Sequence, residues 1–222
     1  CDLIGFHGQT IYHNPKKKTS IQLGNPQKLA HLLNKDVVFN FRSEDIGSGG
    51  QGAPLAPIYH LALSKILNEN SLIFLNIGGI SNLTFIDFDC DLIAFDTGPG
   101  NAPIDDFVKM HKSGSMDKDG QFAKRGNLDK NVVESIMSNK YFQKPFPKSL
   151  DRFDFKFQKL SNLSLEDGCA TITKIIALSI SKSIDLLPKK PKKIILTGGG
   201  RKNSSLVEQI NFETKINCSK IE

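Results

Sequence analysis

The sequence predicts an α/β fold, because short apolar runs alternate with segments of helical periodicity along most of its 222 residues. Glycine-rich turns follow several of the apolar runs, as they do at the ligand-binding edge of open α/β sheets. The proline- and glycine-rich segment 43–57 follows the run DVVFNFR and predicts a boundary there. We therefore expect one domain over residues 1–45 and another over 46–222.

The expected strands are the apolar runs at 2–6, 20–24, 36–42, 71–78, 82–87, 91–96 and 192–197. The expected helices are 26–34, 57–68, 101–112, 128–139, 165–187 and 203–211. The helix over 165–187 has the clearest pattern, because its apolar residues recur at spacings of three and four and form one stripe. Ser164 is suited to cap its first turn.

The composition is that of an ordinary soluble globular protein with no membrane span and no signal peptide, which predicts a cytoplasmic location. The net charge is +6, but the runs NPKKKTS and PKKPKK are proline-flanked and carry no interleaved aromatic residues, so no nucleic-acid site is expected. The scattered Cys1, Cys90, Cys169 and Cys218 form no metal-binding cluster. The chain begins within an apolar run and ends without a terminating helix, and we expect an internal fragment.

The apolar run LIAF ends on a carboxylate, Asp96, and passes directly into TGPGN. We expect Asp96 at the end of a strand and a glycine turn after it. Gly98 and Gly100 would leave the backbone bare for a close ligand, and Pro99 would stiffen the turn. The segment predicts a pocket floor at the carboxyl end of a strand.

Two further glycine motifs follow predicted strands. NIGG, residues 76–79, predicts a hairpin whose glycines form either a plain tight turn or a set of bare N–H groups for a phosphate oxygen. The triple glycine 198–200 precedes a helix capped by Asn203 or Ser204, and a nucleotide contact explains it better than a plain loop.

Two motifs near the amino terminus carry different weights. GSGGQG, residues 47–52, satisfies GxGxxG, but Pro54 and Pro57 delay the next helix, so a ligand-lining loop is favoured over a dinucleotide site. In GFHGQT, His7 lies among glycines just after a strand, and Gln9 adds hydrogen-bonding capacity. The other four histidines are interpreted as structural or exposed.

The ordered set of motifs closely resembles the anhydro-N-acetylmuramic acid kinase family over nearly the whole chain. The motifs are GFHGQTIYHNP, SIQLGNP, VVFNFRSEDIGSGGQGAPLAPIYH, LNIGGISNLT, FDTGPGN, DKDGQFAKRGN, PKSLDR and LTGGGRKN. The resemblance implies the RNase H-like actin/sugar-kinase (ASKHA) fold, with two lobes around a cleft and an incomplete first lobe.

The resemblance also implies a reaction: ATP phosphorylates 1,6-anhydro-N-acetylmuramic acid while water opens the anhydro ring. The product is N-acetylmuramic acid 6-phosphate, in bacterial cell-wall (peptidoglycan) recycling. ATP and Mg²⁺ are the implied cofactors, although no Mg²⁺ ligand can be assigned, and a homodimer is a possible assembly.

Residue roles carry over through the matching motifs. The implied catalytic base is Asp96. The implied nucleotide-binding residues are Asn76, Gly78, Gly79, Gly98, Gly198, Gly199, Gly200 and Asn203. The implied sugar-binding residues are His7, Gly8, Gln9, Arg42, Gln51 and Gly52.

The chain departs from the family pattern at both ends. It has neither the amino-terminal MSGTSxDGxD-like phosphate loop nor the carboxy-terminal ME-x-x-AFA-like helix, so these residues alone are expected to be inactive. Two alternatives stay open: another hexose kinase of the superfamily, and a carbohydrate-binding protein without turnover. Asp96 argues against the second, because a pure binder needs no base at that position.

Overall fold

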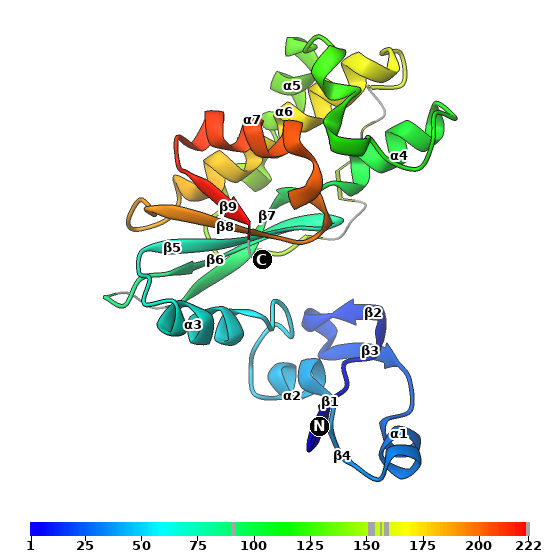
Figure 1. Cartoon of the computed structure of the whole chain (residues 1–222), viewed down its shortest axis with the longest axis vertical. Coiled ribbons are helices and arrows are strands. Elements are labelled where there is room, and N and C mark those ends of the chain that lie inside the picture. Colours follow the sequence, from blue (N-terminus) through cyan, green and yellow to red (C-terminus); the bar gives the residue numbers. More distant parts are fainter. Residues whose placement is uncertain (90–91, 151–153, 156, 158–159, 221–222) are drawn as a thin grey trace. The chain divides into compact units, whose positions relative to one another are not determined.

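The computed structural model describes residues 1–89, 92–150, 154–155, 157 and 160–220 (Figure 1). The chain forms two compact units, residues 1–58 and 59–222, which are described separately below. The lobe boundary expected after residue 45 falls inside the first unit, and it stays a prediction.

The first unit consists of two small sheets and two short helices. Strands β1 (Leu3–Gly5) and β4 (Asp36–Val38) pair in parallel. Strands β2 (Gln9–Asn14) and β3 (Thr19–Leu23) form an antiparallel pair. The helices are α1 (Pro26–Leu33) and α2 (Phe41–Gly47).

Two sequence expectations for this unit were wrong. The strand expected over 36–42 ends at Val38, because Asn40 takes a left-handed conformation (φ 64°) and turns the chain into α2. Strand β2 was not expected, because its residues QTIYHN are mostly polar and lack clear alternation. Pairing with β3, rather than local propensity, makes it a strand.

The second unit contains one five-stranded mixed sheet in the order β7-β6-β5-β8-β9. The strands are β5 (Leu72–Ile77), β6 (Ile80–Ile86), β7 (Ile93–Pro99), β8 (Lys193–Thr197) and β9 (Cys218–Lys220). β5, β6 and β7 are antiparallel neighbours, and β8 and β9 continue parallel to β5. The expected adjacency of the three runs between residues 71 and 96 is therefore confirmed, although residue 91 lies outside the described residues.

Alternation along β5 separates the two faces of this sheet. Ile73, Leu75 and Ile77 pack into the large core with helix α6, whereas Leu72 and Phe74 pack against α3. Helices α4 (Ala102–Met110), α5 (Lys130–Met137), α6 (Leu165–Ile184) and α7 (Ser204–Thr214) lie on the first side (Figure 1). Helix α3 (Pro57–Ile66) covers the other side from Tyr59 onward.

Helix α6 is the centre of the core, as its apolar stripe predicts. Cys169, Ile172, Ile176 and Ile180 are fully buried, and Ser164 Oγ accepts the N–H of Asp167 at 3.1 Å to cap the first turn. Cys169 is a free thiol, as are Cys1 and Cys218, whereas Cys90 lies outside the described residues.

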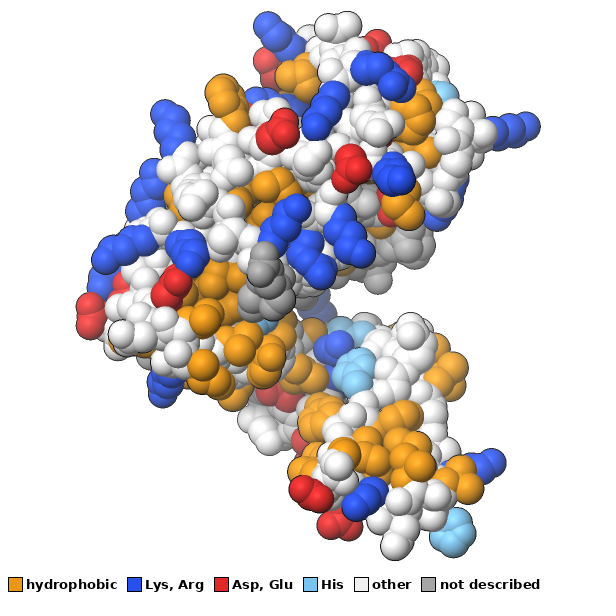
Figure 2. Space-filling view, viewed as in Figure 1, with side chains coloured by type: hydrophobic (Ala, Val, Ile, Leu, Met, Phe, Trp, Pro, Cys, Tyr) orange, Lys and Arg blue, Asp and Glu red, His pale blue; other side chains and the backbone are white. Residues whose placement is uncertain are grey.

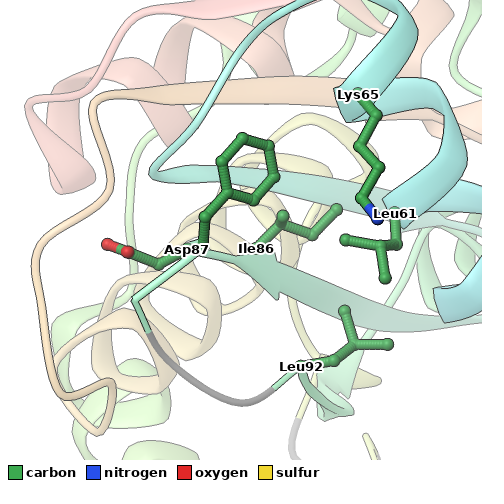
Figure 3. Close-up of a pocket in the computed structure, with 6 residues that line it drawn as sticks. Leu61, Lys65, Ile86, Asp87 and Leu92 are labelled. Carbon is green, nitrogen blue, oxygen red and sulfur yellow. The ribbon is translucent and has the colours of Figure 1, made fainter.

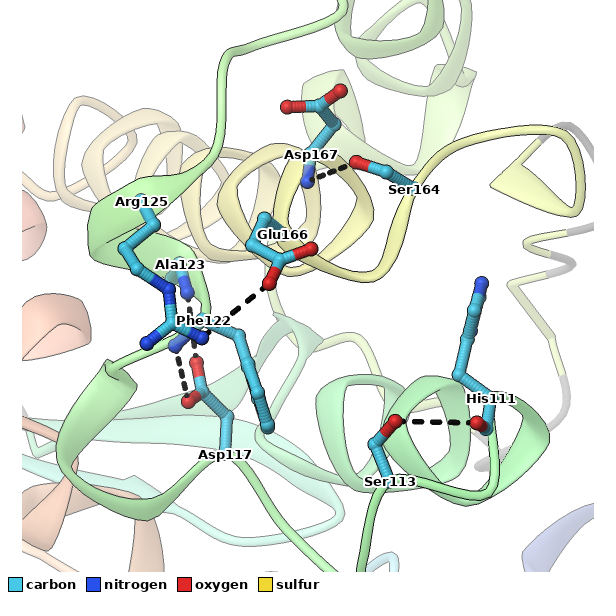
Figure 4. A network of polar contacts seen from close by, with 9 residues as sticks. All are labelled: His111, Ser113, Asp117, Phe122, Ala123, Arg125, Ser164, Glu166 and Asp167. Carbon is cyan, nitrogen blue, oxygen red and sulfur yellow. Dashed lines mark hydrogen bonds and ion pairs between the residues drawn. The ribbon is translucent and has the colours of Figure 1, made fainter.

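The motif DKDGQFAKRGN folds around a buried aspartate (Figure 4). Asp117 is 4% exposed and accepts the N–H groups of Phe122 (2.8 Å) and Ala123 (3.1 Å). Arg125 donates to Glu166 at the start of α6 (3.3 Å). The motif therefore contacts α6 through Arg125 and the start of α7 through Gly120. A Cβ at Gly120 would lie only 2.4 Å from Oδ1 of Asn203, the cap residue of α7.

Candidate active site

Three glycine segments of the second unit meet at one end of the strands, where β5, β7 and β8 finish. The NIGG residues form the expected hairpin turn between β5 and β6. The triple glycine follows β8, which is the parallel neighbour of β5. A Cβ at Gly198 would lie 2.5 Å from Asn76 Oδ1, and one at Gly200 would lie 2.4 Å from Ile77 Cγ2. The two motifs therefore lie side by side.

The third segment, after Asp96, docks onto the same hairpin. The N–H of Gly100 donates to Gly79 O (3.1 Å), and the N–H of Asn101 donates to Gly78 O (2.7 Å). A Cβ at Gly100 would lie 2.3 Å from Gly78 O, so backbone packing explains this glycine. Asn203 caps α7 by accepting the N–H of Leu206 (3.1 Å), as one of the two expected caps.

Asp96 does not end its strand, and that expectation was wrong. β7 continues to Pro99 because β6 supplies partners as far as Ile80. The pairing shifts at Thr97, which is the extra residue between the pairs Asn82–Asp96 and Ser81–Gly98. Proline is tolerated there because β7 is an edge strand of the sheet.

Gly98 is explained by packing rather than by a nearby ligand. It is buried, and a Cβ would lie 2.7 Å from Ser179 Oγ and 2.8 Å from Ser179 Cβ on α6. Gly199, in contrast, has open space where a Cβ would lie and is exposed. Of the expected phosphate-contacting glycines, Gly79 and Gly199 are exposed, whereas Gly78 is half-buried and its N–H donates to Ile80 O (3.1 Å).

The carboxylate of Asp96 is fixed by segment 148–150. Leu150 N donates to Asp96 Oδ2 (2.9 Å), and the N–H of Asp96 donates to Lys148 O (3.1 Å). Oδ1 accepts no hydrogen bond from the described residues. Burial raises the pKa of Asp96 from 3.8 to about 6, although the Leu150 N–H opposes the shift. A carboxylate with a pKa near 6 is ionised at neutral pH and can accept a proton there.

Two further residues around Asp96 were missed from the sequence. The Tyr141 hydroxyl donates to Asp96 O (2.6 Å), and burial, then Asp96, raise the pKa of this phenol. The Lys148 ammonium lies 4.7 Å from the centre of the Tyr141 ring and 5.4 Å from that of Phe95. Burial lowers the pKa of Lys148 to about 8. For Lys148, the available signal was its place in PKSL, which is part of one of the family-like motifs.

In the first unit, Arg42 brings three of the expected sugar-binding residues together. Its Nε donates to His7 Nε2 (2.8 Å), and its Nη1 donates to Gly52 O (2.5 Å). The N–H of Gly52 donates to Asp45 Oδ2 (2.7 Å), which fixes the loop. Gln51 precedes Gly52 in this loop.

The remaining two predicted residues lie at the start of β2. Gly8 takes a φ of 72°, which favours glycine, and a Cβ there would lie 2.5 Å from Leu23 O. The Gln9 side chain contacts Thr10 O at 3.5 Å and no part of the Arg42 cluster in the described contacts. The turn geometry explains Gly8, and the role of Gln9 stays a prediction.

Each unit also has a hollow. In the first unit, a pocket of about 290 Å³ next to His7 is lined by Phe6, Gln22, Gln27, Phe39 and Asn40. In the second unit, a pocket of about 310 Å³ lies between α3 and the end of β6 (Figure 3). Its residues Leu61, Ile86 and Leu92 are apolar, and it lies at the opposite end of β5 and β6 from the glycine hairpin.

The described residues do not form a dedicated metal site. Across the described ranges, no three His, Cys, Asp or Glu side chains come together to hold an ion. Every helix in the part of the chain that the structure covers is too short or too polar to cross a membrane. Lysine and arginine side chains are spread over the visible face of residues 59–222, and hydrophobic side chains gather over α3 (Figure 2).

The five-stranded mixed sheet and its helices define an α/β protein with a fold like that of sugar kinases. The chain is similar to the solved structure of a xyloylose kinase from Brucella ovis, with a TM-score of 0.50 and 10% sequence identity over 69% of this chain and 36% of that chain. The expected RNase H-like actin/sugar-kinase (ASKHA) fold class is confirmed by this similarity of fold.

Sequence comparison identifies the family. The family model for anhydro-N-acetylmuramic acid kinase matches residues 1–217, and the chain belongs to this family. Anhydro-N-acetylmuramic acid kinase 2 of Jannaschia sp. is 44% identical over 99% of this chain and 59% of its own length. The corresponding kinase of Rhizobium rhizogenes is 41% identical over 94% of this chain and 57% of its own length. The chain thus spans less than two thirds of these relatives.

Proposed function

We propose that the protein phosphorylates 1,6-anhydro-N-acetylmuramic acid with ATP while it hydrolyses the anhydro bridge. Family membership supports the substrate. The single observation that carries the mechanism is the raised pKa of Asp96, about 6. This carboxylate lies near the same end of the strands as the three glycine segments.

Asp96 acts as the general base in this proposal. It takes a proton from a water molecule as the water oxygen bonds to C1 of the sugar and the bond from C1 to O6 breaks. O6 then attacks the γ-phosphorus and ADP leaves, which yields N-acetylmuramic acid 6-phosphate. Oδ1, which accepts no hydrogen bond from the described residues, is the oxygen suited to accept the proton, since Oδ2 is held by Leu150.

The nucleotide binds in this proposal at the glycine loops of residues 59–222. The exposed backbone of Gly79 and Gly199 offers N–H groups to phosphate oxygens. Asn76 and Asn203 border these loops, and Gly198 and Gly200 act by shaping the loop against β5 rather than by contact. Mg²⁺ is a further expectation, but no three His, Cys, Asp or Glu side chains among the described residues come together to hold it.

The sugar contacts are assigned to the first unit, to His7, Gly8, Gln9, Arg42, Gln51 and Gly52. The contacts among His7, Arg42 and Gly52 support this assignment. A cytoplasmic location, a role in peptidoglycan recycling and a homodimer complete the proposal.

The experiment uses the protein at its natural full length with ATP and 1,6-anhydro-N-acetylmuramic acid in ¹⁸O-labelled water. Label is expected at C1 of the 6-phosphate product. Asp96→Asn should reduce kcat by at least about 10⁴-fold and leave binding of both substrates largely intact, because an amide cannot take the proton. Asp185→Asn, an exposed aspartate at the end of α6, is the control. Phosphorylation of a simple hexose without label would instead support another hexose kinase, and binding without turnover would support a carbohydrate-binding protein.

A further inference from the structure

Four polar side chains form a row across four neighbouring strands of the second unit. The strand register aligns Thr197, Asn76, Asn82 and Asp96, which lie on β8, β5, β6 and β7 in that order. Residues directly opposite one another on paired strands point to the same face of a sheet. Each of the four is flanked along its strand by a residue that packs into the core with α6, so the row lies on the other face. All four side chains are half-buried.

Asn82 and Asp96 are the closest pair in which one member is the proposed base. The N–H of Asp96 donates to Lys148 O, and its C=O accepts the Tyr141 hydroxyl, so these backbone groups point away from β6. Opposite residues of antiparallel strands that exchange no backbone hydrogen bonds have Cα atoms about 4.5 Å apart and side chains close together. Two oxygen acceptors about 4.5 Å apart are bridged by one water molecule. The register therefore sets the two side chains within reach of a shared water.

The polar atoms of this pair are available for such a water. The Asn82 side chain makes no hydrogen bond with any described residue, although it is half-buried. Leu150 N holds Oδ2 of Asp96, so the carboxylate keeps its orientation while Oδ1 stays open. A carboxylate oxygen and an amide oxygen are both acceptors, and water is the smallest molecule that offers two donors.

Asn76, the next residue of the row, lies on the nucleotide side. A Cβ at Gly78 would lie 3.7 Å from Asn76 Nδ2, and one at Gly198 would lie 2.5 Å from Asn76 Oδ1. Asn76 therefore borders the glycine loops, whereas Asn82 lies between Asn76 and the proposed base.

We propose that Asn82 is a second catalytic residue of the hydrolytic step and holds the attacking water together with Asp96. The inference rests on the proposed function. Asp96 Oδ1 takes one proton of the water, and the other proton donates to Asn82 Oδ1 and stays on the oxygen that becomes the C1 hydroxyl. As this oxygen bonds to C1, the electron pair of the C1–O6 bond moves to O6, which bonds to the γ-phosphorus as ADP leaves. Two fixed acceptors orient the lone pairs of the water toward C1.

The first test measures kcat and KM in the full-length protein with ATP and 1,6-anhydro-N-acetylmuramic acid. Asn82→Ala should lower kcat by roughly 10- to 100-fold and change KM for either substrate by less than about 3-fold, because the lost contact is to the water and not to a substrate. Asn131→Ala, at an exposed asparagine of α5, is the matched control and should change neither. An unchanged kcat in Asn82→Ala would overturn the inference, whether KM rises or not.

A second variant tests the proximity of the two side chains without turnover. Asn82→Asp places a second carboxylate opposite Asp96, and repulsion between the like charges should raise the pKa of Asp96 by at least about one unit. Carbon-13 NMR of labelled aspartate carboxyl groups measures this pKa, and the signal of Asp96 is the one that disappears in Asp96→Asn. Asn131→Asp should leave the pKa unchanged. An unchanged pKa in Asn82→Asp would overturn the inference.

Methanol distinguishes a water-holding role from a bracing role for Asn82. Methanol offers one proton to Asp96 but turns a methyl group toward Asn82, where water offers its second donor. The wild-type protein in water–methanol mixtures should therefore exclude methanol, and Asn82→Ala should form the methyl glycoside 6-phosphate as well. Equal fractions of this product from both proteins would overturn the inference. A wild-type protein that opened no anhydro sugar would contradict the proposed function, and the NMR titration would still support or overturn the pairing of Asn82 with Asp96.

Discussion

Asp96→Asn should stabilise the second unit at neutral and alkaline pH while it removes activity. The pKa of Asp96 is raised from 3.8 to about 6, so the folded protein holds the proton more tightly than the unfolded chain does. A raised carboxyl pKa contributes stability that is fully present below pH 3.8 and is lost as the pH rises through about 6. Above that window, the wild-type protein carries the cost of a buried charge.

The expected magnitude follows from the shift. About two pKa units correspond to about 3 kcal/mol in the free energy of unfolding. Asparagine, which is neutral at every pH, avoids this cost but weakens the hydrogen bond from Leu150 N by about 1 kcal/mol. The net gain is about 2 kcal/mol at pH 8, which raises the melting temperature by about 4–8 °C for a unit of this size.

Thermal melting of the wild-type and Asp96→Asn proteins between pH 4 and pH 8 measures this difference. The two melting temperatures should be nearly equal at pH 4 and diverge as the pH rises through 6. Asp185→Asn should give a difference that does not change with pH. A variant that melts below the wild type at pH 8 would refute the reasoning, because Asp96 would then be a stabilising carboxylate held by Leu150 and not one destabilised by burial.

Two further predictions concern packing. Gly98→Ala should lower the free energy of unfolding by about 1–3 kcal/mol, because the new methyl group would overlap Ser179. Chemical denaturation measures this loss. Gly199→Ala is the control, because the space where its Cβ would lie is open. Residues 1–58 expressed alone should give the circular dichroism spectrum of an unfolded chain, because Ile46 is the one hydrophobic side chain that is buried in that fully described unit. A folded spectrum would contradict this prediction. Residues 59–222 expressed alone should give a helical spectrum and a cooperative thermal melt.

The sequence predicted the elements whose signals are local. Helix α6 follows from a stripe of apolar residues, and the hairpin after β5 follows from a glycine pair between two apolar runs. The extension of β7 through Thr97–Pro99 could not be predicted, because glycine and proline favour a turn there and only the partner strand β6 overrides them. The three-residue β9 is likewise held by its pairing with β8.

The sequence indicated single residues of the candidate site, but it did not indicate which residues contact one another there. Asp96 was identified because a carboxylate ends an apolar run within a family-like motif. Its supports Tyr141 and Leu150 are 45 and 54 residues away in sequence, and no local pattern indicates that they meet it. The same holds for His7 and Arg42, which are 35 residues apart. Such contacts depend on the path of the whole chain.

The backbone contact between Asp96 and Lys148 also bears on aggregation. β7 is an edge strand, and an open edge offers its N–H and C=O groups to a strand of another molecule. Lys148 O occupies the N–H of Asp96, and Pro99 has no N–H to offer. The segment that holds the proposed base in place therefore also shields the sheet from pairing with a second copy, so that a change which loosens it exposes the protein to self-association as well as to loss of function.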